Sequence, residues 1–301
     1  MLRSKFVGCL VGSALGDALG NTYEGLRTPE VKMEDFSGRW TDDTHLMIGV
    51  AESLIRNKGF NARHMAETFI RNYDEEPWRG YGPGPPRVFK WIKSGVAWSK
   101  AAKRLYGGAG SYGNGAAMRV APVGIFYYDD VKRLRAVSNA QSRITHTHEL
   151  GMEGAALQAY AVALATKAEA SSKLDLSAFL SELQGFACNE VYEQKLRKIQ
   201  GLLDEKSKRR VTRELGNSVT AHNSVPTAIY SFLRNRHSLK KSVLYAISLG
   251  GDTDTIGAMT GAISGAYHGE EAIPECWKNG LESREHIEML ARKLWRIKSR
   301  E

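Results

Sequence analysis

Two short clusters of carboxylate and hydroxyl side chains are the part of this sequence best suited to chemistry. Residues 40–44 read WTDDT, and residues 250–255 read GGDTDT. Each cluster comes directly before a run of apolar residues at helical spacing, where a single Thr or Asp is expected as the N-cap. Carboxylates in a first turn also suit the helix dipole. A cap needs only one acceptor oxygen, however, so capping leaves most of these oxygens unexplained.

Together the two clusters contain four carboxylates, those of Asp42, Asp43, Asp252 and Asp254. If the fold brought them face to face, they would repel one another unless cations lay between them. Mg²⁺ and Mn²⁺ prefer oxygen ligands of this kind, and pairs of metal ions about 3.5–4 Å apart recur in hydrolytic enzymes. The clusters therefore predict a dinuclear metal site for hydrolysis, provided that the early and the late aspartates converge in space.

A glycine-rich stretch, residues 107–115 (GGAGSYGNG), precedes Ala116 and Ala117. Exposed backbone N–H groups at the start of a helix are suited to binding phosphate. The stretch matches neither the Walker pattern nor a Rossmann fingerprint, so a plain turn remains an alternative to a phosphate-binding loop. Tyr106 and Tyr112 flank the stretch and could stack on a flat ring, although packing in the core is the commoner fate of such residues.

Helices are the elements predicted to position these residues. Apolar residues recur with a period of about 3.6 over residues 46–55, 155–164, 179–186 and 243–247. Glycines at positions 8, 12, 16 and 20, and again at 257, 261 and 265, form two strips without side chains. Because an interior glycine weakens a helix by ~0.5–1 kcal/mol relative to alanine, close packing of helices is the expected compensation. We therefore predict an all-α fold, a single compact orthogonal helical bundle with a metal-containing cleft, in one domain over residues 1–301.

Composition excludes several classes of protein. The 42 Lys and Arg residues exceed the 33 Asp and Glu residues and give a formal net charge of +9, which attracts anions. The densest basic run, residues 206–213, lacks interleaved aromatic residues and is typical of a solvated helix face, so we predict no nucleic-acid partner. The three cysteines form no disulfide or zinc pattern. No apolar stretch reaches the ~20 residues that span a bilayer, and we expect a cytoplasmic monomer without a membrane partner.

Several motifs, in their order along the chain, resemble those of the ADP-ribosylglycohydrolases, the family that includes dinitrogenase reductase-activating glycohydrolase. They are residues 16–20 (GDALG), 40–44 (WTDDT), 111–119 (SYGNGAAMR), 145–146 (TH) and 250–255 (GGDTDT). Further segments resemble the branch of that family that cleaves O-linked ADP-ribose, namely residues 23–24 (YE), 79–82 (RGYG), 111–115 (SYGNG) and 224–230 (SVPTAIY). The resemblance implies ADP-ribosylated proteins or ADP-ribose-containing small molecules as partners, with ADP-ribosyl-serine, O-acetyl-ADP-ribose and poly(ADP-ribose) as substrates.

The resemblance also implies roles for individual residues. Two Mg²⁺ ions, or Mn²⁺ in their place, would be bound by Thr41, Asp42, Asp43, Asp252, Asp254 and Thr255. The expected catalytic residues are Glu24, on a mobile loop that gates the metals, and Asp252, which would also handle a proton. The expected substrate-binding residues are Gly82, Tyr106, Ser111, Tyr112, Gly113, Asn114, Gly115 and His146. The 111–115 segment would hold the diphosphate with His146 close by, and the two tyrosines would enclose the adenine.

The implied reaction is hydrolysis at the anomeric carbon of the distal ribose. Most glycosidases use a pair of carboxylates as acid and base; here metals would replace part of that machinery and position the sugar. Two alternatives remain open. The same scaffold could cleave N-linked ADP-ribose from arginine, or the protein could be a non-catalytic ADP-ribose-binding or structural protein, as in crystallin-like relatives. The complete set of six metal-ligand positions argues against a purely structural role.

Overall fold

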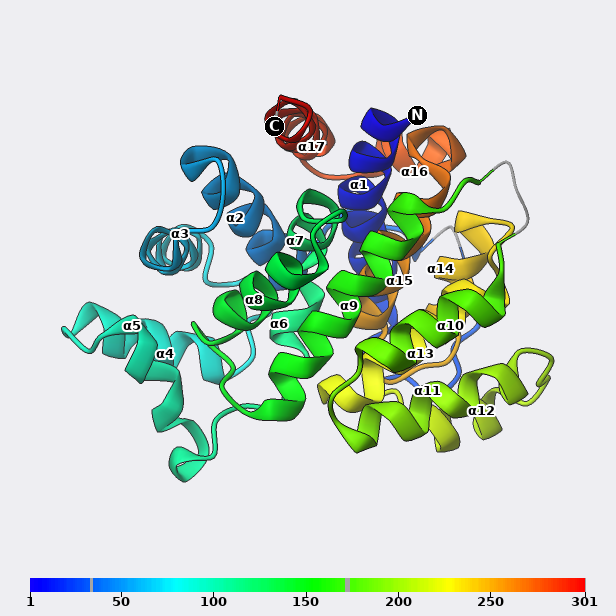
Figure 1. Ribbon diagram of the computed structural model, residues 1–301, viewed down its shortest axis with the longest axis horizontal. Coiled ribbons are helices and arrows are strands. Elements are labelled where there is room, and N and C mark those ends of the chain that lie inside the picture. Colours follow the sequence, from blue (N-terminus) through cyan, green and yellow to red (C-terminus); the bar gives the residue numbers. More distant parts are fainter. Residues whose placement is uncertain (33–34, 171–173, 301) are drawn as a thin grey trace.

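The computed structural model describes residues 1–32, 35–170 and 174–300, and it confirms the predicted all-α fold (Figure 1). No β-strand occurs in these three ranges, although an isolated antiparallel bridge pairs Gly113 with Thr220. In chain order, with η for a 3-10 helix, the elements are α1 (Leu2–Gly20), η1 (Asn21–Tyr23), α2 (Asp42–Asn57), α3 (Ala62–Glu75), α4 (Gly84–Lys93), α5 (Trp98–Ala101), η3 (Ala102–Gly108), α6 (Gly115–Met118), α7 (Ala121–Phe126), α8 (Val131–Ser142), α9 (Glu149–Lys167), α10 (Leu176–Phe186), α11 (Glu190–Leu202), α12 (Lys208–Leu215), α13 (Ala221–Arg234), α14 (Leu239–Ile247), α15 (Thr253–His268), η4 (Glu270–Ala272), α16 (Glu275–Gly280) and α17 (Arg284–Lys298).

Helices α1 and α15 lie side by side near the centre of the fold (Figure 1). Their two glycine strips face each other in antiparallel register, with Gly8 against Gly265, Gly12 against Gly261 and Gly16 against Gly257. A Cβ atom added at Gly16 would lie only 2.0 Å from the carbonyl oxygen of Gly257. The close packing predicted from the spacing is confirmed, and at these positions it requires glycine.

The antiparallel register has a consequence for the site. The end of α1 lies beside the start of α15, where the hydroxyl of Thr253 donates a hydrogen bond to the carbonyl of Gly20 at 2.8 Å. The chain that leaves α1 therefore passes the second carboxylate cluster before it continues to α2. Residues about 230 positions apart, 20 and 253, are neighbours for this reason.

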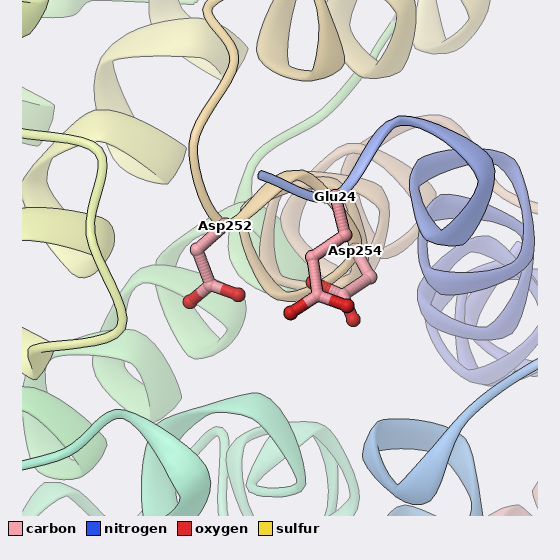
Figure 2. Close-up of side chains that lie close together, drawn as sticks. All are labelled: Glu24, Asp252 and Asp254. Carbon is pink, nitrogen blue, oxygen red and sulfur yellow. The ribbon is translucent and has the colours of Figure 1, made fainter. Parts of the chain in front are cut away.

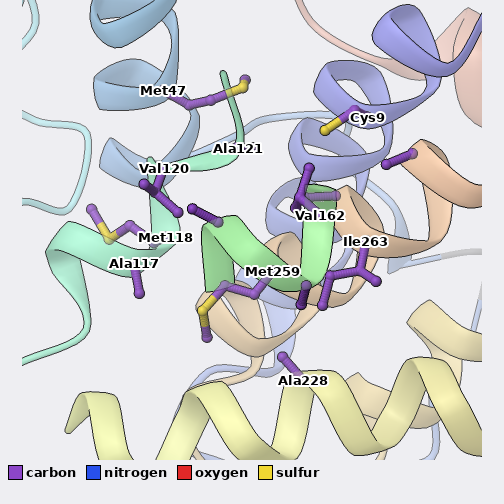
Figure 3. Close-up of a cluster of buried hydrophobic side chains, with 14 of the residues drawn as sticks. Cys9, Met47, Ala117, Met118, Val120, Ala121, Val162, Ala228, Met259 and Ile263 are labelled. Carbon is purple, nitrogen blue, oxygen red and sulfur yellow. The ribbon is translucent and has the colours of Figure 1, made fainter. Parts of the chain in front are cut away.

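A hydrophobic core surrounds this helix pair, and Figure 3 shows part of it. Cys9 of α1, Val162 of α9, and Met259 and Ile263 of α15 are fully buried there. The buried amide of Gln158 on α9 donates to the carbonyl of Met259 at 2.9 Å. Apolar burial and this polar contact together hold α9 across α15, so the start of α15 is carried by a rigid centre.

Helix α2 begins at Asp42 because Thr41 caps it. Oγ1 of Thr41 accepts a hydrogen bond from the N–H of Asp43 at 3.3 Å, and the backbone of Thr41 is extended. Asp42 and Asp43 thus occupy the first turn, where the helix dipole stabilises carboxylates. Asp254 occupies the first turn of α15 in the same way. Both predicted clusters therefore lie at helix starts.

Three expectations about the rest of the chain can be compared with the structure. The described residues contain no helix that is both long and apolar enough to cross a membrane. The three cysteines are free thiols. Most of the basic run lies in α12, where the exposed Arg210 forms an ion pair with Glu205 at 2.9 Å, as expected of a solvated helix face.

Candidate active site

The two carboxylate clusters line the same cavity. Asp42 and Asp43 reach it from the start of α2, and Asp252 and Asp254 reach it from the start of α15. Thr41 and Thr255 line it as well, so the structure brings all six predicted metal ligands together. Of the other residues singled out from the sequence, the cavity is lined by Glu24, Gly82, Tyr106, Ser111, Gly113, Asn114, Gly115 and His146.

Glu24, Asp252 and Asp254 form the tightest acidic group of the cavity (Figure 2). One carboxylate oxygen from each lies within 4.8 Å of the others, and the two aspartates are buried while Glu24 is exposed. The segment that carries Glu24 is joined to the turn before Asp252, because Gly25 N–H donates to the carbonyl of Gly251 at 2.8 Å. This backbone contact fixes where Glu24 stands relative to the second cluster.

Burial and mutual repulsion act on these carboxyl groups in the same direction. Desolvation, followed by the charge of Asp254, raises the pKa of Asp43 well above its usual range. Desolvation and the charge of Asp252 do the same to the pKa of Asp254. Burial and the charge of Asp17 raise the pKa of Asp42 to about 8. Ionising all of these carboxyl groups together would therefore require positive charge that the surrounding described residues do not supply.

The chemistry of these residues fits a divalent cation. Oδ2 of Asp43 is buried and has no hydrogen-bond partner within the described ranges of the chain. The atoms around it are carboxylate and hydroxyl oxygens, which are the ligands that hard cations prefer. A bound cation would give Asp43 a partner and would offset the repulsion between the two clusters.

Asp17 is an important residue of the site to which sequence reasoning assigned no role. It is fully buried on α1, and its two oxygens accept hydrogen bonds from the N–H and hydroxyl groups of both Thr41 (3.0 and 2.9 Å) and Thr44 (3.0 and 2.6 Å). Because the hydroxyl hydrogen of Thr41 is donated to Asp17 and one lone pair accepts the N–H of Asp43, Oγ1 of Thr41 has one lone pair left for a cation. The available signal was the single acidic residue of α1, placed directly after a glycine of its strip.

The 111–115 segment is held by contacts within the protein. The N–H of Gly113 donates to Oγ of Ser111 at 3.2 Å, and the N–H of Asn114 donates to the carbonyl of Val219 at 3.0 Å. The side-chain amide of Asn114 donates to Oδ2 of Asp252. Two of the backbone N–H groups expected to bind phosphate are thus already paired within the protein. The segment has a further role, because Asn114 orients a carboxylate of the acidic cluster.

His146 packs against the glycines of this segment. A Cβ atom on Gly115 would lie 2.8 Å from Cε1 of His146, so glycine leaves the space that the ring occupies. Nδ1 of the ring is 2.8 Å from the hydroxyl of Thr145. Desolvation, followed by the charge of Arg119, lowers the pKa of His146 to about 3. The imidazole is therefore neutral at physiological pH and serves as a hydrogen-bonding group.

Arg119 is the second residue of the cavity that had no assigned role. It is fully buried and lines the cavity. Its Nε and Nη2 donate to the side chain and the carbonyl of Gln141, at 2.8 and 3.0 Å, whereas Nη1 has no partner among the residues described. A buried guanidinium with a free donor is a feature that no local sequence pattern predicts, although Arg119 ends the 111–119 motif.

The two tyrosines expected to enclose an adenine are placed differently. Tyr106 lines the cavity and is 57% exposed. Tyr112 is not among the lining residues; its ring centroid lies 5.3 Å from that of His148 and 6.2 Å from that of His222. In this structure Tyr106 alone of the pair faces the cavity.

Comparison with known proteins gives a consistent result. The family model described as ADP-ribosylglycohydrolase matches residues 1–301. ADP-ribosylhydrolase ARH3 of Homo sapiens is 37% identical, over 98% of this chain and 93% of that protein. ADP-ribosylarginine hydrolase Tri1 of Serratia proteamaculans is 27% identical, over 97% of this chain and 79% of that protein. A solved structure named ADP-ribosylglycohydrolase-related protein complex is 28% identical, with a TM-score of 0.79 and coverage of 99% of both chains.

Proposed function

The chain belongs to the ADP-ribosylglycohydrolase family and is therefore a glycosidic-bond hydrolase, and we propose that it releases ADP-ribose from O-linked acceptors with the help of two Mg²⁺ or Mn²⁺ ions. Its substrates would be ADP-ribosyl-serine in proteins, O-acetyl-ADP-ribose and poly(ADP-ribose). The observation that carries the proposal is the meeting of the early and the late aspartates in one cavity, beside a glycine-rich segment and an exposed tyrosine.

The residues that would hold the cations are Thr41, Asp42, Asp43, Asp252, Asp254 and Thr255, with Glu24 at the opening. Bound divalent cations would supply electrostatic stabilisation for the water nucleophile and would bind hydroxyl oxygens of the ribose. The unpartnered oxygen of Asp43 and the raised pKa values of the cluster support this assignment.

Other residues of the chain would bind and orient the substrate. Asp17 accepts the hydroxyl hydrogen of Thr41, which leaves a lone pair of Oγ1 for a cation, and Asn114 holds one oxygen of Asp252. The other oxygen of Asp252 would take the proton of the attacking water. Neutral His146 would donate to or accept from the substrate beside the 111–115 segment, where the diphosphate would lie, and Tyr106 would stack on the adenine.

The proposal can be tested by removing one carboxylate. Asp254→Ala should lose Mg²⁺ binding in calorimetry and should abolish release of ADP-ribose from a serine-modified peptide, while the helical circular dichroism spectrum is retained. Asp204→Ala, at an exposed position, is the matched control and should behave like the parent protein. Near-normal turnover by Asp254→Ala would contradict the assignment.

The type of linkage needs its own comparison. The named ADP-ribosylarginine hydrolase is less similar to this chain, at 27% identity, than the ARH3 proteins, at 37%. This difference and the 111–115 motif support the O-linkage. Serine-linked and arginine-linked ADP-ribosyl peptides, incubated separately with the protein, distinguish the two. Release from the arginine-linked peptide alone would overturn this part of the proposal.

A non-catalytic role predicts a different result in the binding and turnover assays. ADP-ribose binding that is indifferent to EDTA, with no hydrolysis, would show a binding protein instead of an enzyme.

We also propose that residues 1–301 form a single domain and a monomer. The support for one domain is that the large hydrophobic core contains residues from α1 to α17. A single thermal transition and a monomeric mass in light scattering are expected.

A further inference from the structure

The basic residues of this chain are distributed unevenly. From position 77 to position 128 the sequence has no Asp or Glu but eight Lys or Arg residues. This stretch alone therefore has a formal charge of +8, compared with +9 for the whole chain. Six of the eight belong to residues 84–108, which form α4, α5 and η3 and are here named the basic lobe; they are Arg87, Lys90, Lys93, Lys100, Lys103 and Arg104. Figure 1 shows α4 and α5 at one end of the longest axis of the molecule.

The basic lobe has a small hydrophobic cluster of its own. Val88, Ala101, Ala102 and Leu105 are buried together, and Trp91 packs against them. Phe89 of α4 joins the lobe to the large core, while the lobe's cationic side chains lie on its solvent side. All six cationic side chains are exposed.

Most of these cations have no counter-charge. Lys93 pairs with Asp74 at 2.9 Å, but none of the other five lies within 4.0 Å of a carboxylate in the described part of the chain. The guanidinium carbons of Arg87 and Arg104 lie 5.9 and 6.0 Å from the ring centroid of Trp91. The lobe is therefore a positive surface that the protein itself does not neutralise.

The basic lobe also borders the cavity. Gly84, Pro85 and Tyr106 line it. Arg87 follows Pro85 by two positions and Arg104 precedes Tyr106 by two, so their Cα atoms are within about 7 Å of lining residues. Both arginines are exposed beside the cavity, and at 0.01 M salt, where the Debye length is about 30 Å, their charges act well beyond the lobe itself.

The interior of the cavity has the opposite charge. Five carboxylates, those of Asp42, Asp43, Asp252, Asp254 and Glu24, line it together with one buried guanidinium, that of Arg119, which gives a formal charge of −4. The two divalent cations proposed above would bring this charge to zero. ADP-ribose carries a diphosphate dianion, so long-range attraction for its phosphates must come from charges outside the cavity lining.

We propose that the basic lobe is an electrostatic docking surface for the diphosphate of the substrate, an inference that rests on the function proposed above. The lobe would attract the dianion to the mouth of the cavity, an attraction that a neutralised cavity lining does not supply. Its cations are exposed, with no built pocket around them. They would therefore act on the rate of association and on its salt dependence more than on the chemical step.

The test compares two triple variants with the same change in net charge. Arg87→Gln/Lys103→Gln/Arg104→Gln removes three charges from the basic lobe, among them the two that border the cavity. Lys206→Gln/Lys240→Gln/Lys241→Gln, also at exposed positions, is the control. Its residues belong to α14 and the turn before α12, and Figure 1 shows these helices on the opposite side of the molecule from α4 and α5.

Association of a fluorescent ADP-ribose analogue would be measured by stopped flow with Mg²⁺ present, from low to high salt. The lobe variant should associate about 10-fold more slowly than the parent at low salt, and the difference should vanish near 1 M salt, where the Debye length is about 3 Å. With a serine-linked substrate, its loss should fall mainly on kcat/KM. The control should match the parent at each salt concentration.

Equal association rates for the lobe variant and the parent would overturn the docking proposal, and so would an equal loss in the control. The two proposals can fail separately. A protein that binds the analogue but hydrolyses no ADP-ribosylated substrate would disprove the function, while normal turnover with salt-independent association would disprove only the docking surface.

Discussion

Gly16→Ala is expected to lower both the stability and the activity of this protein, although it adds only one methyl group. The new Cβ atom would lie 2.0 Å from the carbonyl oxygen of Gly257 and 2.3 Å from its carbonyl carbon, whereas ordinary contacts begin at 3.4 Å. Both atoms belong to the backbone, so no side-chain rotation relieves the clash. Helices α1 and α15 must separate locally by the difference, 1.4 Å, or bend to the same effect.

The expected change in the free energy of unfolding follows from two opposing effects. Overpacking typically destabilises a protein by ~1–3 kcal/mol, and a backbone clash belongs at the upper end. Replacement of a helical glycine by alanine returns only ~0.5–1 kcal/mol. The net loss of about 2 kcal/mol corresponds to a fall in Tm of several degrees. Asp17 follows Gly16 and holds Thr41, so the shift also moves Thr41 away from Asp254, and a displacement of ~1 Å can reduce turnover about 100-fold.

Stability would be measured by thermal denaturation followed by circular dichroism. Activity would be measured as Mg²⁺-supported release of ADP-ribose, at a temperature where the variant is folded. The matched control is Gly201→Ala in α11, because a Cβ atom there meets no heavy atom within 4 Å. That change should stabilise the protein by up to ~1 kcal/mol and leave turnover unaltered. If Gly16→Ala melted at the temperature of the parent and retained its turnover, the packing argument would be refuted.

Three further predictions concern the cavity. Asp17→Asn cannot accept all four hydrogen bonds from Thr41 and Thr44, so Mg²⁺ affinity in calorimetry should fall about 10- to 100-fold; an unchanged affinity would show that Asp17 does not position Thr41. Mg²⁺ at a hundred times its Kd should stabilise the parent by about 2.7 kcal/mol because the ion binds only the folded chain, and this gain should disappear in Asp254→Ala when Tm is measured with and without EDTA. The folded pKa of His146 is about 3, below its usual 6.5, so the unfolded chain binds the extra proton and stability falls as the pH drops from 6.5 towards 3. His146 alone should lower the free energy of unfolding by about 2 kcal/mol between pH 7 and pH 5, and in urea titrations His146→Gln should show a smaller loss than the parent.

The sequence was sufficient for the local features of the site. Thr41 as a cap, aspartates in the first turns of α2 and α15, and the close packing of two glycine strips all follow from short-range preferences. Each depends on residues within one or two helical turns, where spacing alone determines which side chains share a face. The all-α fold follows from the same period.

Other features were decided by tertiary structure. The antiparallel register of α1 and α15 places Glu24 beside Asp252. The residues next to Glu24 and Asp252 in the sequence do not predict this contact. Arg119 is left with an unpartnered donor in the cavity because helices distant in the sequence enclose it.

Tyr112 and Asp17 illustrate how far the sequence alone can assign the contacts of a side chain. Tyr112 lies against His148 and His222, and its contact with the substrate stays a prediction, whereas Asp17, to which no role was assigned, binds both threonines of the first cluster. Residue type and spacing determined which groups could do chemistry. The long-range packing of helices determined which of them meet, because a side chain's direction and partners depend on neighbours that no local pattern specifies.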